Sequence, residues 1–142
     1  MENELLKSIQ KLISEKEIDK DEVKQAHIDF IKKDLKQLHC IDKYIGDFPT
    51  FIEPVHLEGE SKLGDDVLVG PNVYIGNNCE IGDYCEIANT IIFENVQLGE
   101  NFTLQNCIIG PNSKLNFNNF QGFNMVLRGE ADSSEELDKV SL

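Results

Sequence analysis

The 142-residue sequence has no tryptophan, only two methionines and no apolar run approaching the roughly 18 residues of a membrane-spanning helix. Its first four residues lack the basic start and apolar stretch of a secretory signal. Basic residues are also scarce: 13 Lys and Arg stand against 26 Asp and Glu, a net charge of −13 that repels phosphate backbones and anionic membranes. These absences argue against nucleic-acid and membrane partners and predict a cytoplasmic protein.

The four cysteines are too irregularly spaced for a metal site. They occupy positions 40, 79, 85 and 107, without the Cys-x-x-Cys or Cys/His spacing of zinc proteins. A reducing compartment would leave them as thiols, and Cys79, Cys85 and Cys107 fall at small inward positions of the repeat described below. We therefore expect no metal and no cofactor.

A short repeat runs through the middle of the chain. An aliphatic or aromatic anchor recurs about every six positions, at 51, 57, 63, 69, 75, 81, 87, 92, 98, 104, 109 and 115. Glycine follows six of these anchors, at a phase typical of turns, and a small or β-branched residue usually stands two positions before each anchor. This alternation predicts short strands that stack three to a coil, giving a parallel β-solenoid of about four triangular coils.

The two ends of the chain have a different character. Residues 1–45 contain no glycine and hold two amphipathic stripes, so they predict a helical N-terminal segment, with Asp19 and Glu22 as a helix-capping pair. It either caps the first coil or docks a partner. Residues 46–129 form the predicted β-helix, and residues 130–142 an acidic tail or a short C-terminal helix started by Ser133 and Glu136.

The run from Leu63 to Leu115 resembles the hexapeptide-repeat left-handed β-helix. Its shortened pieces NTII (89–92) and NCII (106–109) are most similar to the C-terminal domains of sugar-1-phosphate nucleotidyltransferases and related initiation factor 2B subunits. The resemblance implies a left-handed coil, an assembly role and frequent trimers. In such enzymes catalysis belongs to a separate Rossmann-like domain, and no position here matches its phosphate loop, so no catalytic residue is carried over.

One face of the predicted prism is apolar. Taking every third hexad aligns His56, Tyr74, Ile91 and Ile108, with Phe93 extending the stripe. This stripe predicts a subunit or partner interface, or else a surface covered by the chain's own helices.

Asparagines recur at one turn of the same face. Asn72, Asn89 and Asn106 are spaced by 17 residues and predict a ladder of amides that bond to one another or cap the turns. Contact with a sugar or a peptide is the functional alternative.

Catalytic groups are few on this pattern. Hexapeptide acyltransferases use a histidine base and basic groups near coenzyme A, but between Lys62 and Lys114 the chain has no Lys, Arg or His, which leaves His56 as the one weak candidate. A three-histidine zinc site of the gamma-carbonic-anhydrase type is excluded because His27 and His39 fall on predicted helices.

The leading hypothesis is therefore a non-catalytic β-helix scaffold that forms a homotrimer or binds a protein partner. The alternatives are an acyltransferase acting on a sugar or amino acceptor and a structural subunit of a larger hetero-complex. If the chain is an enzyme, the resemblance implies a transferase.

Overall fold

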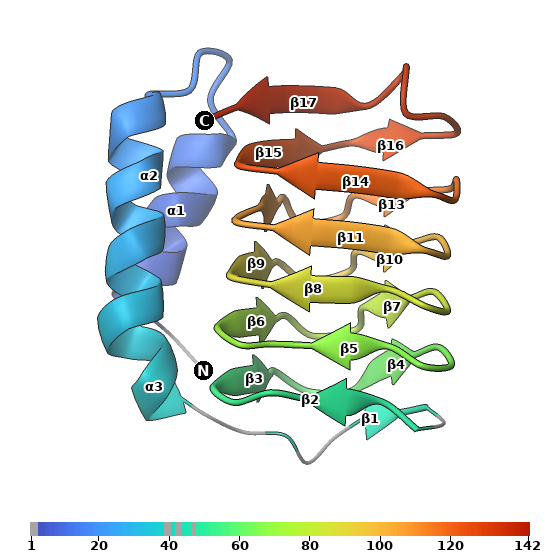
Figure 1. Cartoon of the computed structure of the whole chain (residues 1–142). Helices are drawn as coiled ribbons and strands as arrows, with labels where there is room; N and C mark the ends of the chain where they lie inside the picture. Colours follow the sequence, from blue (N-terminus) through green and yellow to red (C-terminus); the bar gives the residue numbers. More distant parts are fainter. Residues whose placement is uncertain (1–2, 39–40, 42–43, 47) are drawn as a thin grey trace.

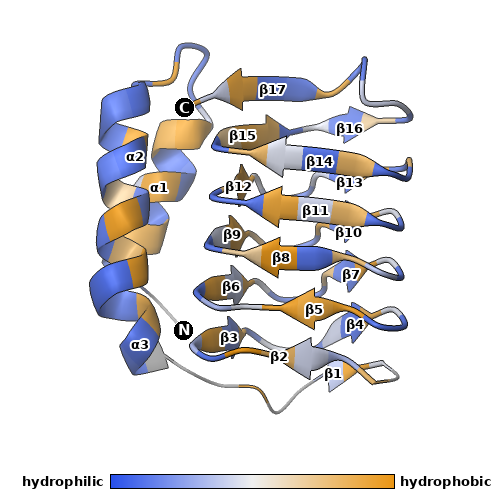
Figure 2. Cartoon of the chain, in the orientation of Figure 1, coloured by the Kyte–Doolittle hydropathy of each residue, from blue (hydrophilic) through white to orange (hydrophobic). Residues whose placement is uncertain are grey.

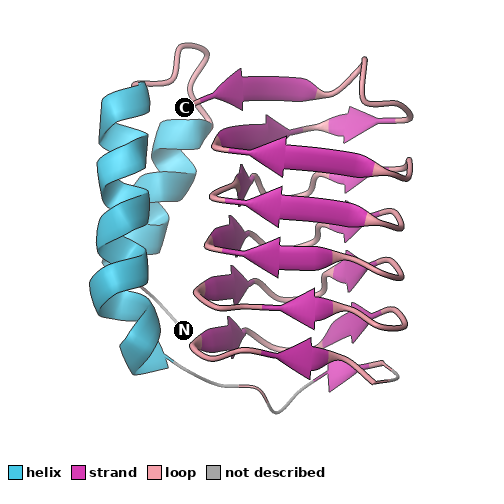
Figure 3. Cartoon of the chain, in the orientation of Figure 1, coloured by secondary structure: helices cyan, strands magenta, loops and turns pink. Residues whose placement is uncertain are grey.

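The protein is a β-solenoid with a layer of helices along one side (Figure 1). The structure is a computed structural model that describes residues 3–38, 41, 44–46 and 48–142. The helical layer consists of α1 (Glu4–Ile13), α2 (Lys20–Asp29), the π-helical turn η1 (Phe30–Asp34) and α3 (Leu35–Leu38). Figure 3 shows that every other element is a strand, so the helical and β parts are cleanly separated along the chain.

Both long helices start at a capping side chain. The Asn3 carboxamide accepts a hydrogen bond from the Leu6 amide at 3.0 Å, and the Asp19 carboxylate accepts one from the Glu22 amide at 3.2 Å. The cap predicted at Asp19 is therefore confirmed. Figure 2 shows α1 as largely apolar and the outer surface of α2 as largely polar.

Three parallel sheets form the faces of the prism. The helix-covered sheet contains β3 (Val55–Leu57), β6 (Val73–Ile75), β9 (Thr90–Ile92), β12 (Ile108–Ile109), β15 (Met125–Arg128) and the antiparallel β17 (Asp138–Ser141). The second contains β1 (Tyr44–Ile45), β4 (Ser61–Leu63), β7 (Glu80–Ile81), β10 (Gln97–Leu98), β13 (Lys114–Leu115) and β16 (Glu130–Ala131). The third contains β2 (Thr50–Phe51), β5 (Leu68–Val69), β8 (Glu86–Ala88), β11 (Phe102–Gln105) and β14 (Phe120–Phe123).

The predicted fold class is confirmed, and the solenoid has about five coils rather than four. It is longer at both ends than the anchor count indicated. At the start, Ile45 lies in β1, six positions before the first anchor counted. At the far end Gly122 stands opposite Leu104, so a glycine occupies an anchor position and hides the repeat. The Phe120 ring fills the space beside Gly122.

The corners of the coils depend on asparagine more than on glycine. Nine asparagines adopt the left-handed backbone conformation: 72, 78, 89, 95, 101, 106, 112, 119 and 124. Most repeat glycines serve close stacking instead. A Cβ on Gly64 would lie 2.6 Å from the Asp83 nitrogen of the next coil, and one on Gly76 would lie 2.7 Å from the Glu94 nitrogen. The glycine phase therefore marks mainly where neighbouring coils approach, and Gly70, with a φ of 111°, is the repeat glycine with a positive φ.

The C-terminal segment forms strands and turns, so the alternative of a short C-terminal helix is wrong. Val140 of β17 pairs antiparallel with Val126 of β15, and Leu137 is buried in the main core. The Glu136 carboxylate accepts a hydrogen bond from the Asp132 amide at 3.1 Å, within a single turn. Burial of Leu137 and strand pairing outweigh the weak capping signal of Ser133.

The division of the chain at 45 and 129 stays a prediction. Over the described part of the chain, the helices are all too short or too polar to cross a membrane.

Candidate functional site

The apolar stripe lies beneath the helices. His56, Tyr74, Ile91 and Ile108 occupy matching positions on β3, β6, β9 and β12, as the hexad spacing predicted. With Phe93 they are at most 8% exposed. All of them except His56 share a second core, separate from the interior of the solenoid, with residues of the helical layer: Leu6, Ile9, Ile13, Val23, Phe30 and Leu35. The structure thus shows the stripe packed against the same chain, one of the two arrangements left open by the sequence.

This covering changes what the stripe offers to another subunit. A side chain buried against α1 and α2 reaches a partner only after the helices move away. Subunit contact through His56, Tyr74, Ile91, Phe93 and Ile108 stays a prediction. Their position accounts for the attachment of the helical layer.

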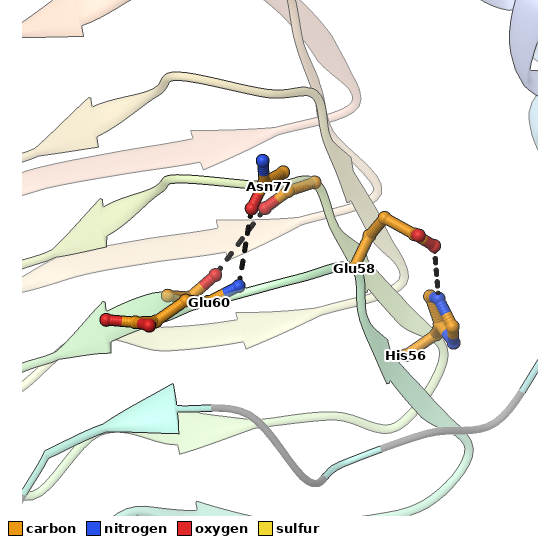
Figure 4. A network of polar contacts seen from close by, with 6 residues as sticks. His56, Glu58, Glu60 and Asn77 are labelled. Atoms are coloured by element: carbon orange, nitrogen blue, oxygen red, sulfur yellow. Dashed lines mark hydrogen bonds and ion pairs between the residues drawn. The ribbon is translucent and has the colours of Figure 1, made fainter. Parts of the chain in front are cut away.

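A polar and aromatic cluster marks the lower end of the stripe. The His56 ring stacks on the Tyr74 ring, with centroids 5.5 Å apart, and the Phe30 ring meets Tyr74 edge-on at 5.8 Å. Figure 4 shows His56 Nε2 pointing at the Glu58 carboxylate, 2.8 Å away. Burial alone would raise the pKa of Glu58, but its hydrogen bond with His56 helps to hold that pKa below its ordinary value.

His56 is poorly placed to act as a catalytic base. It is 4% exposed, and it does not line any of five surface cavities of the described chain. A general base must come within hydrogen-bond reach of a substrate proton. The role of His56 as a base stays a prediction, and none of these five cavities offers it a substrate site. Tyr74 beside it has its pKa raised by burial.

The turn asparagines form part of the predicted ladder. Asn72 Nδ2 donates to Asn89 Oδ1 at 2.9 Å, but Asn89 Nδ2 donates to Gln105 Oε1 at 3.3 Å instead of to Asn106. The backbone carbonyl of Asn89 also lies 2.9 Å from Nε2 of the buried His27 on α2. This corner therefore helps to fix the helical layer, and a ligand role for Asn72, Asn89 and Asn106 stays a prediction.

A longer ladder at another corner was missed. Asn78 Nδ2 donates to Asn95 Oδ1 at 2.9 Å, and Asn95 Nδ2 donates to Asn112 Oδ1 at 3.0 Å. The signal was available, because these asparagines are also 17 residues apart. At the first coils Asn77 Oδ1 accepts a bond from the Glu60 amide at 3.3 Å (Figure 4).

The described cysteines lie in the core. Cys79, Cys85 and Cys107 are free and buried, and burial raises the pKa of each thiol to about 11, away from nucleophile chemistry. Cys40 and His39 lie outside the described residues. In the described chain, His, Cys, Asp and Glu side chains form no group of three that could hold a metal ion.

Hexads that stack into a triangular parallel coil, with asparagines at the corners, define a hexapeptide-repeat β-helix. The model of the GMPPB C-terminal domain family matches residues 51–131, more than half of the chain, so the chain belongs to this family. The resemblance to the left-handed, non-catalytic β-helix domain of sugar nucleotidyltransferases is confirmed. No curated protein and no solved structure shows a significant match to the chain.

Proposed function

We propose that this chain is a β-helix scaffold that works by associating with a second copy of itself, without a catalytic step of its own. β-helix domains of this family commonly oligomerise, which supports the proposal. We place the scaffold in the cytoplasm, where the free thiols Cys79, Cys85 and Cys107 would stay reduced.

The observation that carries the proposal is the difference between the two ends of the solenoid. We call Tyr44, Ile45, Phe48 and Ile52 the open end. They are 40%, 52%, 85% and 45% exposed, and β1, β2 and β3 beside them are the terminal strands of their sheets. At the far end Phe120, Ala131 and Leu137 are all at most 8% exposed and join the core. The far end exposes one large apolar side chain, Phe123 at 50%, whereas the open end exposes four.

Phe48 is the most exposed of these side chains. Its backbone φ of 57° lies in the left-handed region, which costs a bulky residue about 1–3 kcal/mol. A conformation of this cost that exposes an aromatic ring is typical of a binding residue, because aromatic anchors dominate protein interfaces.

The open end allows two acidic copies to meet through uncharged groups. The chain carries a net charge of −13, so two copies repel one another unless the contact is centred on uncharged groups, and the open end supplies four. A contact between two identical ends is two-fold symmetric and closes as a dimer. A trimer, expected from the resemblance, would instead use the sides of the prism.

The test is the solution mass by light scattering over a range of concentrations. We expect a dimer that becomes a monomer when Phe48→Glu and Ile52→Glu are combined. The matched control is Tyr84→Glu, which alters a ring 57% exposed elsewhere on the solenoid and should leave the mass unchanged.

The other outcomes are equally decisive. A trimer insensitive to Phe48→Glu and Ile52→Glu would move the interface to the sides of the prism and refute the open end. A wild-type monomer would refute self-association, and capture of one defined partner that depends on Phe48 would then favour the hetero-complex alternative.

A further inference from the structure

A cavity of about 260 Å³ lies between α2 and one corner of the later coils. Its wall contains residues of α2 and of the coils: Lys24, His27, Ile28, Asn106, Asn124 and Leu142. The three helical residues lie on one side of α2, because positions three and four apart face the same way. A hollow between packed elements is a common setting for ligand sites.

The asparagine ladder of this corner stops beside the cavity. Asn72 bonds to Asn89, but Asn89 bonds on to Gln105. The next two asparagines of the corner, Asn106 and Asn124, are exposed. Within the described chain, their carboxamides form no hydrogen bond with another residue. The wall of the cavity therefore contains two amides that the fold does not use.

His27 brings a buried imidazole to the same wall. It is 5% exposed, and its Nε2 lies 2.9 Å from the Asn89 carbonyl oxygen. Because a carbonyl oxygen only accepts hydrogen bonds, Nε2 carries the proton and Nδ1 is left as an acceptor. Burial lowers the pKa of His27 to about 4, so the ring is neutral at neutral pH. The wall thus offers a buried acceptor that a ligand N–H can satisfy.

The rest of the wall favours a ligand with both a polar and an apolar part. Lys24 is exposed and adds a further hydrogen-bond donor. Ile28 is 45% exposed, and Leu142 packs against the second core under the helices. These two residues give the cavity an apolar surface beside its polar groups.

The larger cavity of about 530 Å³, between α1 and the later coils, offers less. Arg128 in its wall donates from Nη1 to the carbonyl oxygens of Ile13 and Glu15 at 2.7 and 2.9 Å. Its Nη2 lies 3.1 Å from the Asp138 carboxylate. Arg128 therefore fastens the end of α1 to β15, and both of these nitrogens are already engaged.

We propose that the smaller cavity binds a small molecule that carries a neutral carboxamide on an apolar body. An N–H of the ligand would donate to Nδ1 of His27, and its carbonyl oxygen would accept from the amide of Asn106 or Asn124. The apolar body would lie on Ile28 and Leu142. A carboxylate in the same place would leave Nδ1 without a donor. This site is independent of the open end and of the scaffold function.

The probe is benzamide, and its binding is followed by ¹⁵N NMR of the histidine rings. The signals missing from the His27→Gln variant identify those of His27. We expect saturable binding with a millimolar Kd and an upfield shift of the Nδ1 signal as this nitrogen accepts a hydrogen bond. Acetophenone has the size of benzamide and keeps the carbonyl and the ring, but it has no N–H. It should bind about fivefold more weakly.

Matched variants locate the probe. Asn106→Gly with Asn124→Gly removes both carboxamides at positions of positive φ, which glycine tolerates, and should weaken benzamide binding about fivefold. Asn101→Gly with Asn119→Gly makes the same change at another corner, outside this cavity, and should leave the affinity unchanged. Urea unfolding of each variant confirms that it is folded.

Several results would overturn the proposal. They are an absence of saturable binding, equal affinity for benzamide and acetophenone, an unmoved Nδ1 signal, and an equal loss of affinity in both pairs of asparagine variants. The first three are measured on the wild type, so they do not depend on how a variant folds. Benzyl alcohol bound as tightly as benzamide would overturn the carboxamide assignment in favour of a hydroxyl group.

Discussion

The rings of His56 and Tyr74 lie nearly parallel, 11° apart, although the two residues belong to successive coils. The pair lies where the helical layer meets the solenoid, because the Phe30 ring of η1 also contacts Tyr74, in a T-shaped arrangement. Residues predicted as a surface stripe thus form a junction inside the chain.

Ile91→Lys combined with Ile108→Lys should release the helical layer. Both side chains are 0% exposed, and an unpaired ammonium group at such a site costs at least about 3 kcal/mol. We expect rapid proteolysis within residues 3–38 while the coils resist. Gln121→Lys, at an exposed position on the third sheet, is the control. A loss of subunits with the helices still protected would instead support the stripe as a subunit interface.

His27 should make the protein less stable in acid. Burial lowers its pKa from 6.5 to about 4, and the hydrogen bond with Asn89 opposes this only partly. The unfolded chain therefore binds the proton first as the pH falls from 6.5 towards 4. Stability present above pH 6.5 should decline by about 3 kcal/mol across this window.

The measurement is urea unfolding at several pH values for the wild type and His27→Gln. The difference between the two isolates His27 from the carboxylates, among them Glu58. Parallel pH profiles would show that the buried imidazole does not set the acid stability.

Substitutions at Asn95 should separate the stability contributed by the amide ladder from the stability contributed by the turn conformation. Asn95→Gly removes the amide bonds to Asn78 and Asn112 but tolerates the φ of 60°, and should cost about 1 kcal/mol. Asn95→Ala should cost about 1 kcal/mol more, because alanine is disfavoured in the left-handed region. Urea unfolding gives both values, and equal losses would contradict the backbone contribution.

Glycine should be required at only some repeat positions. A Cβ on Gly99 would strike the Phe117 carbonyl oxygen of the next coil, so Gly99→Ala should cost about 1–3 kcal/mol. A Cβ on Gly110 would find its nearest neighbour at 3.5 Å, so Gly110→Ala should change stability by at most about 0.5 kcal/mol. Thermal unfolding of the pair tests the close-stacking explanation, which fails if the two variants behave alike.

Much of the solenoid could be predicted because its contacts are local. Residues that pair between parallel strands of successive coils are 16 to 18 positions apart, so the anchor spacing alone aligned Tyr74 with Ile91 and Ile91 with Ile108. The prediction failed at the far end, where Phe120 of the same strand fills the space beside Gly122 and no anchor side chain is present.

The candidate sites were harder to predict because they depend on long-range packing. The sequence of an amphipathic helix indicates that the helix has an apolar face, but it does not indicate which surface that face covers. The bond between Arg128 and the Ile13 carbonyl joins distant segments, and no sequence period connects these two residues. The ladder of Asn78, Asn95 and Asn112, by contrast, could be predicted from its 17-residue spacing.

The bond from Arg128 to the Ile13 carbonyl spans 115 positions, whereas the strands beside it pair with neighbours one coil away. A plain stack of coils can lose its terminal repeats one at a time, because each repeat contacts only its neighbours. Here the first helix is hydrogen-bonded to the last full coil. Fraying of the coils at that end therefore also detaches the helix. During synthesis, this fastening must wait until Arg128 has left the ribosome. We therefore expect the helical layer to couple the coils into one cooperative unit, completed only when nearly the whole chain has been made.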